Sequence, residues 1–141
     1  MDGKKKFILD FAFDQFGEPY VWGGDGNDKW DCSGLVLGCL KYAGLWGTND
    51  TTAQGIQRAF HIFGESVVEA DEVEPGDLVF YGHNEDSIVH VGICLGNGIM
   101  IGANGSKLRG GKVDIRPIKY HPLPVVAYID PVIGWEKKQK V

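Results

Sequence analysis

The 141-residue sequence is short of the residues that mark several classes of protein. Its three cysteines are too widely spaced for a disulfide framework and include no Cys-x-x-Cys pair for zinc, so neither a metal nor a cofactor is expected. It lacks an apolar run of about eighteen residues, so no membrane span is expected. Basic residues number 14 against 19 acidic ones and cluster only in short segments near the two termini, which argues against nucleic acid as a partner.

The sequence also lacks the apolar core of a signal peptide, because Asp10 and Asp14 interrupt the stretch that follows the charged N-terminus. We therefore expect no export signal. Its length favours one domain, and an apolar fraction of 43% is enough for a hydrophobic core. Glycine is abundant, with 21 residues, which predicts many turns.

Helical periodicity dominates the first half of the sequence. Apolar positions recur at three- and four-residue steps, and capping residues stand at the expected ends. The stretch 17–30, which is rich in glycine and aromatic residues, predicts an ordered loop instead. The predicted helices are 7–16, closed by Gly17, 32–43, capped by Asp31 and ended by Gly44, and 53–60, capped by Thr52.

Short runs of β-branched and aromatic residues in the second half predict strands at 77–81, 89–95, 99–103, 113–118 and 125–129. The turn Gly96-Asn97-Gly98 predicts a hairpin between two of them. Helices followed by a hairpin-linked sheet indicate an α+β fold, with N-terminal helices packed on a central antiparallel sheet. We expect one domain over 1–131 and a polar C-terminal tail over 132–141 that is frayed or rests on the surface.

Cys32 is the candidate nucleophile because it directly follows the predicted N-cap Asp31. At the start of a helix, the unpaired amides and the helix dipole favour a thiolate, and the same amides can stabilise an oxyanion. A buried structural cysteine is the alternative, and it is the expected fate of Cys39 and Cys94, which lie in apolar runs.

His90 is the candidate base, since it lies on a predicted strand with Gly92 alongside on the same face. A half-buried histidine with satisfied hydrogen bonds is the alternative. The other three histidines, His61, His83 and His121, lie at predicted helix ends or in loops and are expected at the surface.

Four motifs occur in an order and spacing that resemble the NlpC family of papain-like cell-wall peptidases. They cover nearly the whole sequence, from about residue 7 to residue 131. The motifs are Glu18-Pro19-Tyr20-Val21-Trp22-Gly23-Gly24, Asp31-Cys32-Ser33-Gly34-Leu35-Val36, Pro75-Gly76-Asp77-Leu78-Val79-Phe80-Tyr81, and His90-Val91-Gly92-Ile93 with Leu95-Gly96-Asn97-Gly98.

The resemblance implies a papain-like fold and a cysteine peptidase that cleaves peptidoglycan stem peptides through a thioester, typically between D-γ-glutamate and a diamino acid. Cys32 would be the nucleophile and His90 the general base. Tyr20 matches a family tyrosine that holds the substrate or oxyanion, although aromatic packing is its alternative role. Asp31 and Ser33 match substrate contacts, and Trp22 is expected in the core or in a substrate groove wall.

One position departs from the family pattern. Relatives usually carry a polar residue, most often histidine, about twelve positions after the catalytic histidine, where it orients the imidazole; here that position is Gly102. Asn104 lies two residues further on the same strand face and is the predicted substitute. A backbone carbonyl, an ordered water or a loss of efficient catalysis are the alternatives. Residues 102–111 are expected to form a loop, either mobile over the site or an ordinary exposed hairpin loop.

Without an export signal or an appended wall-binding domain, the sequence would suit a bacteriophage or prophage enzyme, released by lysis or carried in a virion. Its acidic charge suggests that a partner protein supplies targeting. Two other functions stay open at this point. One is a thiol amidase or acyltransferase acting on another acyl substrate, and the other is a binding or structural module that has lost turnover.

Overall fold

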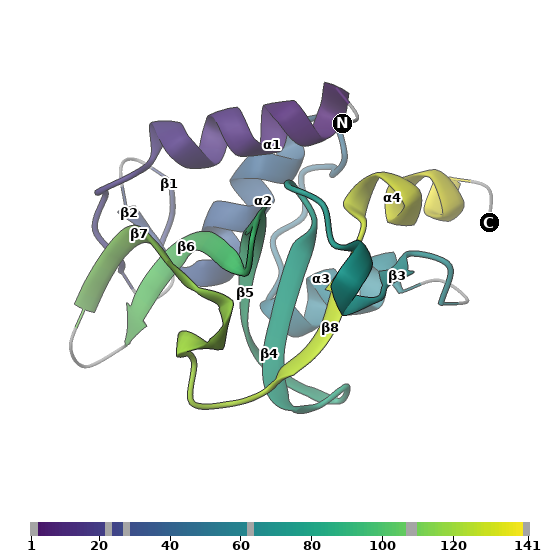
Figure 1. Cartoon of the computed structure of the whole chain (residues 1–141). Helices are drawn as coiled ribbons and strands as arrows, with labels where there is room; N and C mark the ends of the chain where they lie inside the picture. Colours follow the sequence, from purple (N-terminus) through teal and green to yellow (C-terminus); the bar gives the residue numbers. More distant parts are fainter. Residues whose placement is uncertain (1–2, 22–23, 27–28, 62–63, 107–109, 140–141) are drawn as a thin grey trace.

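The computed structural model describes residues 3–21, 24–26, 29–61, 64–106 and 110–139. Its centre is a six-stranded antiparallel sheet in the order β3-β8-β4-β5-β6-β7, and Figure 1 shows α2 and α3 behind this sheet. The strands of this sheet are β3 (Val67–Val68), β4 (Leu78–Asn84), β5 (Ser87–Gly96), β6 (Ile99–Ser106), β7 (Gly110–Pro117) and β8 (Val125–Ile129). The helices are α1 (Gly3–Asp14), α2 (Cys32–Tyr42), α3 (Ala53–Phe60) and α4 (Pro131–Gln139). The predicted α+β fold is therefore confirmed.

Smaller elements connect these units. A two-stranded sheet of β1 (Asp25–Gly26) and β2 (Lys29–Trp30) lies within the segment predicted as a loop, and two short 3-10 helices, η1 (Ala70–Glu72) and η2 (Ile118–Tyr120), follow β3 and β7. None of the helices among the described residues is long and apolar enough to cross a bilayer.

The α2 helix is the central helix of the core. The five residues of its predicted apolar face are all buried: Leu35, Val36, Cys39, Leu40 and Ala43. Asp31 accepts the backbone N–H of Gly34 at 2.6 Å, which confirms the predicted N-cap. The helix packs against α1 and β5, so the sequence at its start is held firmly against the sheet.

The α1 helix begins and ends earlier than predicted, and only part of its predicted apolar face is buried. Phe7 and Phe16 are about half exposed, whereas Lys5 is buried with Ile8 and Ala12. The Lys5 ammonium contacts three carboxylates at 2.8–2.9 Å, those of Glu74, Asp77 and Asp130. A buried cation needs such partners, and they lie too far along the chain for local periodicity to reveal them.

The predicted hairpin joins β5 to β6, and its three turn residues all have positive φ angles. Gly92, between His90 and Cys94 on β5, leaves room for the Met100 side chain, whose Cε would lie 2.0 Å from an added Cβ. Tyr81, Cys94 and Met100 belong to a second, smaller apolar cluster of the sheet. The strand that carries His90 is thereby packed by apolar side chains in both clusters.

The structure corrects the prediction of a polar tail over 132–141. Over its described part the chain forms α4, which buries Val132 and Gly134 and contacts α3. Asp130 accepts the backbone N–H groups of Val132 and Ile133 and so caps this helix. The folded unit therefore includes most of the segment that was expected to be frayed or to rest on the surface.

Candidate active site

Cys32 is the first residue of α2, where the predicted helix start places it. The residue is half-buried, and the backbone N–H groups of Val91, Ser33 and Cys32 itself lie near enough to the sulfur to favour its ionised form. Val91 follows His90 on β5, so the structure brings the predicted nucleophile beside the residue next to the predicted base. The helix tip meets the sheet at this point.

The pKa of Cys32 does not follow the expectation of a stabilised thiolate. The pKa of the thiol is raised to about 11, chiefly by burial and also by the carboxylate of Asp31, although the three backbone N–H groups lower it. The helix start therefore acts in the predicted direction but is outweighed by desolvation. The residue that caps the helix also opposes a negative charge on the neighbouring sulfur.

His90 is buried on β5 and has a low proton affinity. Burial lowers the pKa of its imidazole to about 4, and His121 and Arg116 lower it as well, while the hydrogen bond with Asn104 raises it. Because the pKa of the thiol is raised and that of the imidazole is lowered, Cys32 and His90 both rest uncharged at neutral pH. A proton transfer from sulfur to nitrogen creates opposite charges that offset part of each other's desolvation.

Asn104 on β6 contacts His90, as the alternation of the strand predicts. Its side chain is buried, and its Oδ1 lies 3.1 Å from Nε2 of His90. An added Cβ at Gly102 would lie 3.1 Å from this Oδ1, so the glycine leaves room for the asparagine that contacts the imidazole. Residues 102–106 belong to β6 and residues 110–111 to β7, which corrects the expected loop; 107–109 lie outside the described residues.

Two residues of the site were missed at the sequence level. The Tyr120 hydroxyl lies 2.9 Å from Nε2 of His90 and donates to Oδ1 of Asn104 at 2.8 Å. The His121 ring stacks on His90 at 5.3 Å between centroids and on Tyr81 at 4.8 Å, so the expectation of a surface histidine is wrong for this residue. Tyr120 ends the 3-10 turn that follows β7 and His121 comes directly after it, and no local pattern of the sequence marks either residue.

The hydrogen bonds around His90 define its tautomer. The amide oxygen of Asn104 can only accept, so the Nε2 atom that faces it must carry the proton. The Tyr120 hydroxyl donates its own proton to Asn104, and its oxygen can then accept from the same Nε2–H. The lone pair of the imidazole is therefore on Nδ1, the nitrogen that can act as a base.

The other predicted site residues surround Cys32. Burial raises the pKa of the Tyr20 phenol, and the neighbouring Cys32 and Asp31 raise it as well, so the phenol stays protonated as a donor. The Ser33 hydroxyl donates to Asp31 at 3.3 Å. Trp22 lies outside the described residues. Within the described residues no group of three histidine, cysteine, aspartate or glutamate side chains is arranged to hold a metal ion.

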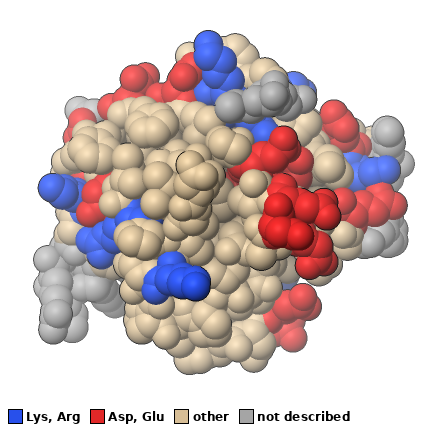
Figure 2. All heavy atoms as spheres, in the orientation of Figure 1, with Lys and Arg blue, Asp and Glu red and all other residues tan. Residues whose placement is uncertain are grey.

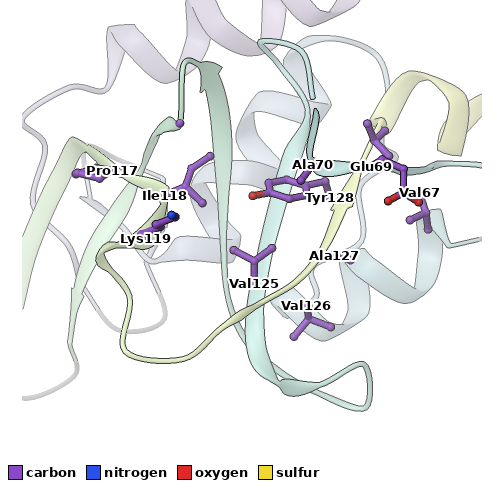
Figure 3. Close-up of a pocket in the computed structure, with 12 residues that line it drawn as sticks. Val67, Glu69, Ala70, Pro117, Ile118, Lys119, Val125, Val126, Ala127 and Tyr128 are labelled. Carbon is purple, nitrogen blue, oxygen red and sulfur yellow. The ribbon is translucent and has the colours of Figure 1, made fainter. Parts of the chain in front are cut away.

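A separate pocket of about 650 Å³ lies between β8, β3 and the η2 segment. Figure 3 shows Val125, Ala127 and Tyr128 along one side and Ile118 and Lys119 on the other. None of the described residues that line it is a predicted site residue, although Lys119 directly precedes Tyr120. The pocket is thus a neighbour of the site rather than part of it.

The sequence model of the NlpC/P60 family matches residues 17–125, which include Tyr20, Cys32, His90, Asn104 and Tyr120. The chain belongs to the NlpC/P60 family. The predicted resemblance is confirmed, and the NlpC/P60 match covers every described element from β1 to η2.

Named relatives agree with this assignment. The chain is 40% identical over 105 residues to the bifunctional muramidase/DL-endopeptidase CwlT of Bacillus subtilis, covering 72% of this chain and 30% of CwlT. It is 36% identical to the probable endopeptidase p60 of Listeria seeligeri, covering 71% of this chain and 18% of that protein. The chain thus spans less than a third of the length of these relatives.

A solved structure shows the same fold at the scale of one domain. The P60 domain of the Mycobacterium avium subspecies paratuberculosis antigen MAP1204 superposes with a TM-score of 0.68 at 27% identity, covering 92% of this chain and 95% of that one. The described NlpC/P60 fold therefore corresponds to nearly the whole of that domain.

Proposed function

We propose that this NlpC/P60 domain is a cysteine endopeptidase that hydrolyses peptidoglycan stem peptides at the bond between D-γ-glutamate and a diamino acid. The observation that carries the proposal is the approach of the α2 tip to β5, where the backbone N–H of Val91 acts on the Cys32 sulfur and the preceding residue, His90, has its Nε2–H held by Asn104. The names of the relatives, which include endopeptidases, support a peptide substrate.

The first step follows from the charge state of the resting pair. As the Cys32 sulfur attacks the γ-carbonyl carbon, its proton passes to Nδ1 of His90, and the C=O electrons move to the oxygen. The resulting oxyanion can accept a hydrogen bond from the Cys32 backbone N–H and from the protonated Tyr20 hydroxyl. Asn104 holds the imidazole by accepting its Nε2–H throughout.

The second half regenerates the enzyme. When the tetrahedral intermediate collapses, the C–N bond breaks and the imidazolium gives its proton to the leaving amine, which leaves a thioester on Cys32. A water molecule then attacks the thioester carbonyl and loses a proton to His90. The thiol is restored when the sulfur leaves and takes up that proton.

The charge distribution gives no support for a polyanion as the substrate. Figure 2 shows one face that is mostly uncharged, with acidic side chains gathered on its right side and basic ones scattered. A formal net charge of -5 likewise gives no attraction to an anionic wall polymer. Phage origin, release by lysis or in a virion, and a targeting partner stay predictions.

Digestion of purified peptidoglycan tests the proposed function. The expected products carry a new free amine on the diamino acid and a new D-glutamate γ-carboxylate, identified by mass spectrometry, and they are absent with Cys32→Ala. Cys39→Ala is the matched control, because Cys39 is buried in the core and should keep turnover. Hydrolysis of simple esters without any cleavage of peptidoglycan would instead indicate another acyl substrate.

A further inference from the structure

Asp114 on β7 makes the shortest contact of the network around Asn104. Its Oδ1 accepts from Nδ2 of Asn104 at 2.7 Å, and its backbone carbonyl accepts from the same nitrogen at 3.2 Å. Asp114 offers only acceptors to that end of the amide, so Nδ2 must face Asp114 and Oδ1 must face His90. The direction of the Asn104 amide is thus determined from the side opposite His90.

The register of β6 and β7 explains how these side chains meet. Asp114 pairs directly with Gly102, while Asn104 pairs with Lys112. Asp114 and Asn104 are therefore diagonal neighbours on one face, and the glycine opposite Asp114 leaves the space beside the Asn104 amide free of a side chain. The residue that departs from the family pattern is the one that makes room for this amide.

Asp114 is itself held in place. The Arg116 guanidinium contacts both carboxylate oxygens of Asp114 at 3.1–3.3 Å and lies over the Tyr120 ring at 5.1 Å from its centroid. The hydroxyl of Tyr120 completes the arrangement by donating to Asn104. Tyr120 is fixed in turn because the Tyr81 hydroxyl donates to the carbonyl of Ile118 in the same 3-10 turn.

A surface ion pair with Arg116 is the simpler account of Asp114. The Asp114 side chain is only 17% exposed, however, and its closest partner is a buried amide rather than the guanidinium. We propose that Asp114 is a positioning residue for the reaction proposed above, and that it acts through Asn104 to fix the Nε2–H tautomer of His90.

Imidazole ¹⁵N shifts of the free enzyme test this without substrate, since they distinguish a protonated ring nitrogen from one with a lone pair. His90 of the wild type should be protonated at Nε2 alone. Asp114→Ala should populate the Nδ1–H tautomer, because the asparagine amide can then rotate. Asp114→Asn, which retains an acceptor oxygen, should restore the wild-type pattern.

Kinetics on stem peptides give the second readout. Asp114→Ala should lower kcat about tenfold with little change in KM, the loss expected when one orienting hydrogen bond no longer favours the reactive tautomer. Asp114→Asn should stay within about threefold of wild type, since the acceptor remains. Asp71→Ala, which removes an exposed carboxylate from η1, is the matched control and should leave both readouts unchanged.

The outcomes separate this inference from the proposed function. If no variant and no wild-type enzyme cleaves stem peptides, the function fails while the ¹⁵N shifts still decide the role of Asp114. A wild-type His90 protonated at Nδ1 would overturn the inference without any variant. So would a single Nε2–H tautomer together with full kcat in Asp114→Ala or, if that variant does not fold, in Asp114→Val, which suits a strand.

Discussion

The two sides of His90 are built in different ways. On the side of Cys32, the thiol is placed by one helix start and a cap one residue away. On the other side, Nε2 is held by Asn104 from β6 and Tyr120 from η2. The position of the proposed nucleophile therefore depends on a local motif. The positions of the groups that orient His90 depend instead on strand register and on a turn that is distant from His90 in the sequence.

The difference shows where a family site can change. The first residue of α2 must supply the sulfur that attacks the substrate, so no other residue type can replace Cys32 there. The orienting side needs only an acceptor near Nε2, and here the acceptor stands two residues along β6 from the position used by relatives, beside a glycine. Variants on each side of His90 test this difference.

Removing the sulfur should have the largest effect. Cys32→Ala should lower turnover of stem peptides by at least about 10⁴-fold, because no other group can form the thioester. The fold should persist, since the lost atom is small and half-buried. Circular dichroism checks the fold and single-turnover kinetics the rate; a variant with more than about a hundredth of wild-type activity would remove Cys32 from the mechanism.

Because His90 is buried, the free energy of unfolding should depend on pH. The pKa is about 4 in the folded protein against 6.5 for a free imidazole, so the unfolded chain binds the proton first as the pH falls. The free energy of unfolding should therefore drop by about 3 kcal/mol between pH 7 and pH 4 on account of this residue.

Urea unfolding of wild type and His90→Gln at both pH values measures that contribution. The variant should lose about 3 kcal/mol less than wild type on acidification. His83→Gln, at an exposed position of β4, is the control and should behave as wild type does. Equal losses in wild type and His90→Gln would mean that His90 is not buried in its neutral form.

Removing the orienting amide should cost less than removing the sulfur. Asn104→Ala should lower kcat by about 10- to 100-fold, the rate equivalent of a hydrogen bond to a group that becomes charged. Steady-state kinetics at neutral pH measure it, with the exposed Asn49→Ala as control. An unchanged kcat would leave Tyr120 or another group as the effective partner of Nε2.

Crowding the amide should have the smallest effect. In Gly102→Ala the new Cβ would meet Oδ1 of Asn104 and Cε of Met100, each at 3.1 Å, so the amide must shift by a few tenths of an ångström. We expect kcat to fall about threefold, as a weakened hydrogen bond implies. Gly47→Ala, where no atom lies within 4 Å of the added Cβ, should have wild-type kinetics.

A double variant tests whether a histidine at position 102 can replace Asn104 as the partner of His90. Gly102→His with Asn104→Ala returns a histidine to the position that relatives use, and kcat should recover above that of Asn104→Ala alone. No recovery would indicate that the backbone of β6 has adapted to the asparagine. Either result shows how far the orienting side can change while Cys32 stays in place.

Local signals explain what the sequence could predict. The cap at Asp31, the apolar face of α2 and the turn at Asn97 each depend on a few consecutive residues, and all three are confirmed. The contact between Asn104 and His90 followed from strand alternation, which needs only a correct strand and a two-residue step.

The missed features are all non-local. Lys5 is buried because three carboxylates from distant segments surround it, and His121 stacks on His90 because the chain after β7 folds it there. The thiol pKa was expected to fall because helix-end effects can be inferred from sequence, whereas desolvation depends on the packing. Counting the register of β6 and β7 from their connection could have placed Asp114 beside Asn104.

The proposed mechanism requires the Cys32 sulfur and the Nδ1 lone pair of His90 to lie within bonding reach of each other. Alkylation of Cys32 with iodoacetamide, followed by imidazole ¹⁵N shifts, tests it directly. The Nδ1 shift of His90 should change while its Nε2 stays protonated, and His61 and His83 should be unaffected. A His90 spectrum identical before and after complete alkylation would contradict the account.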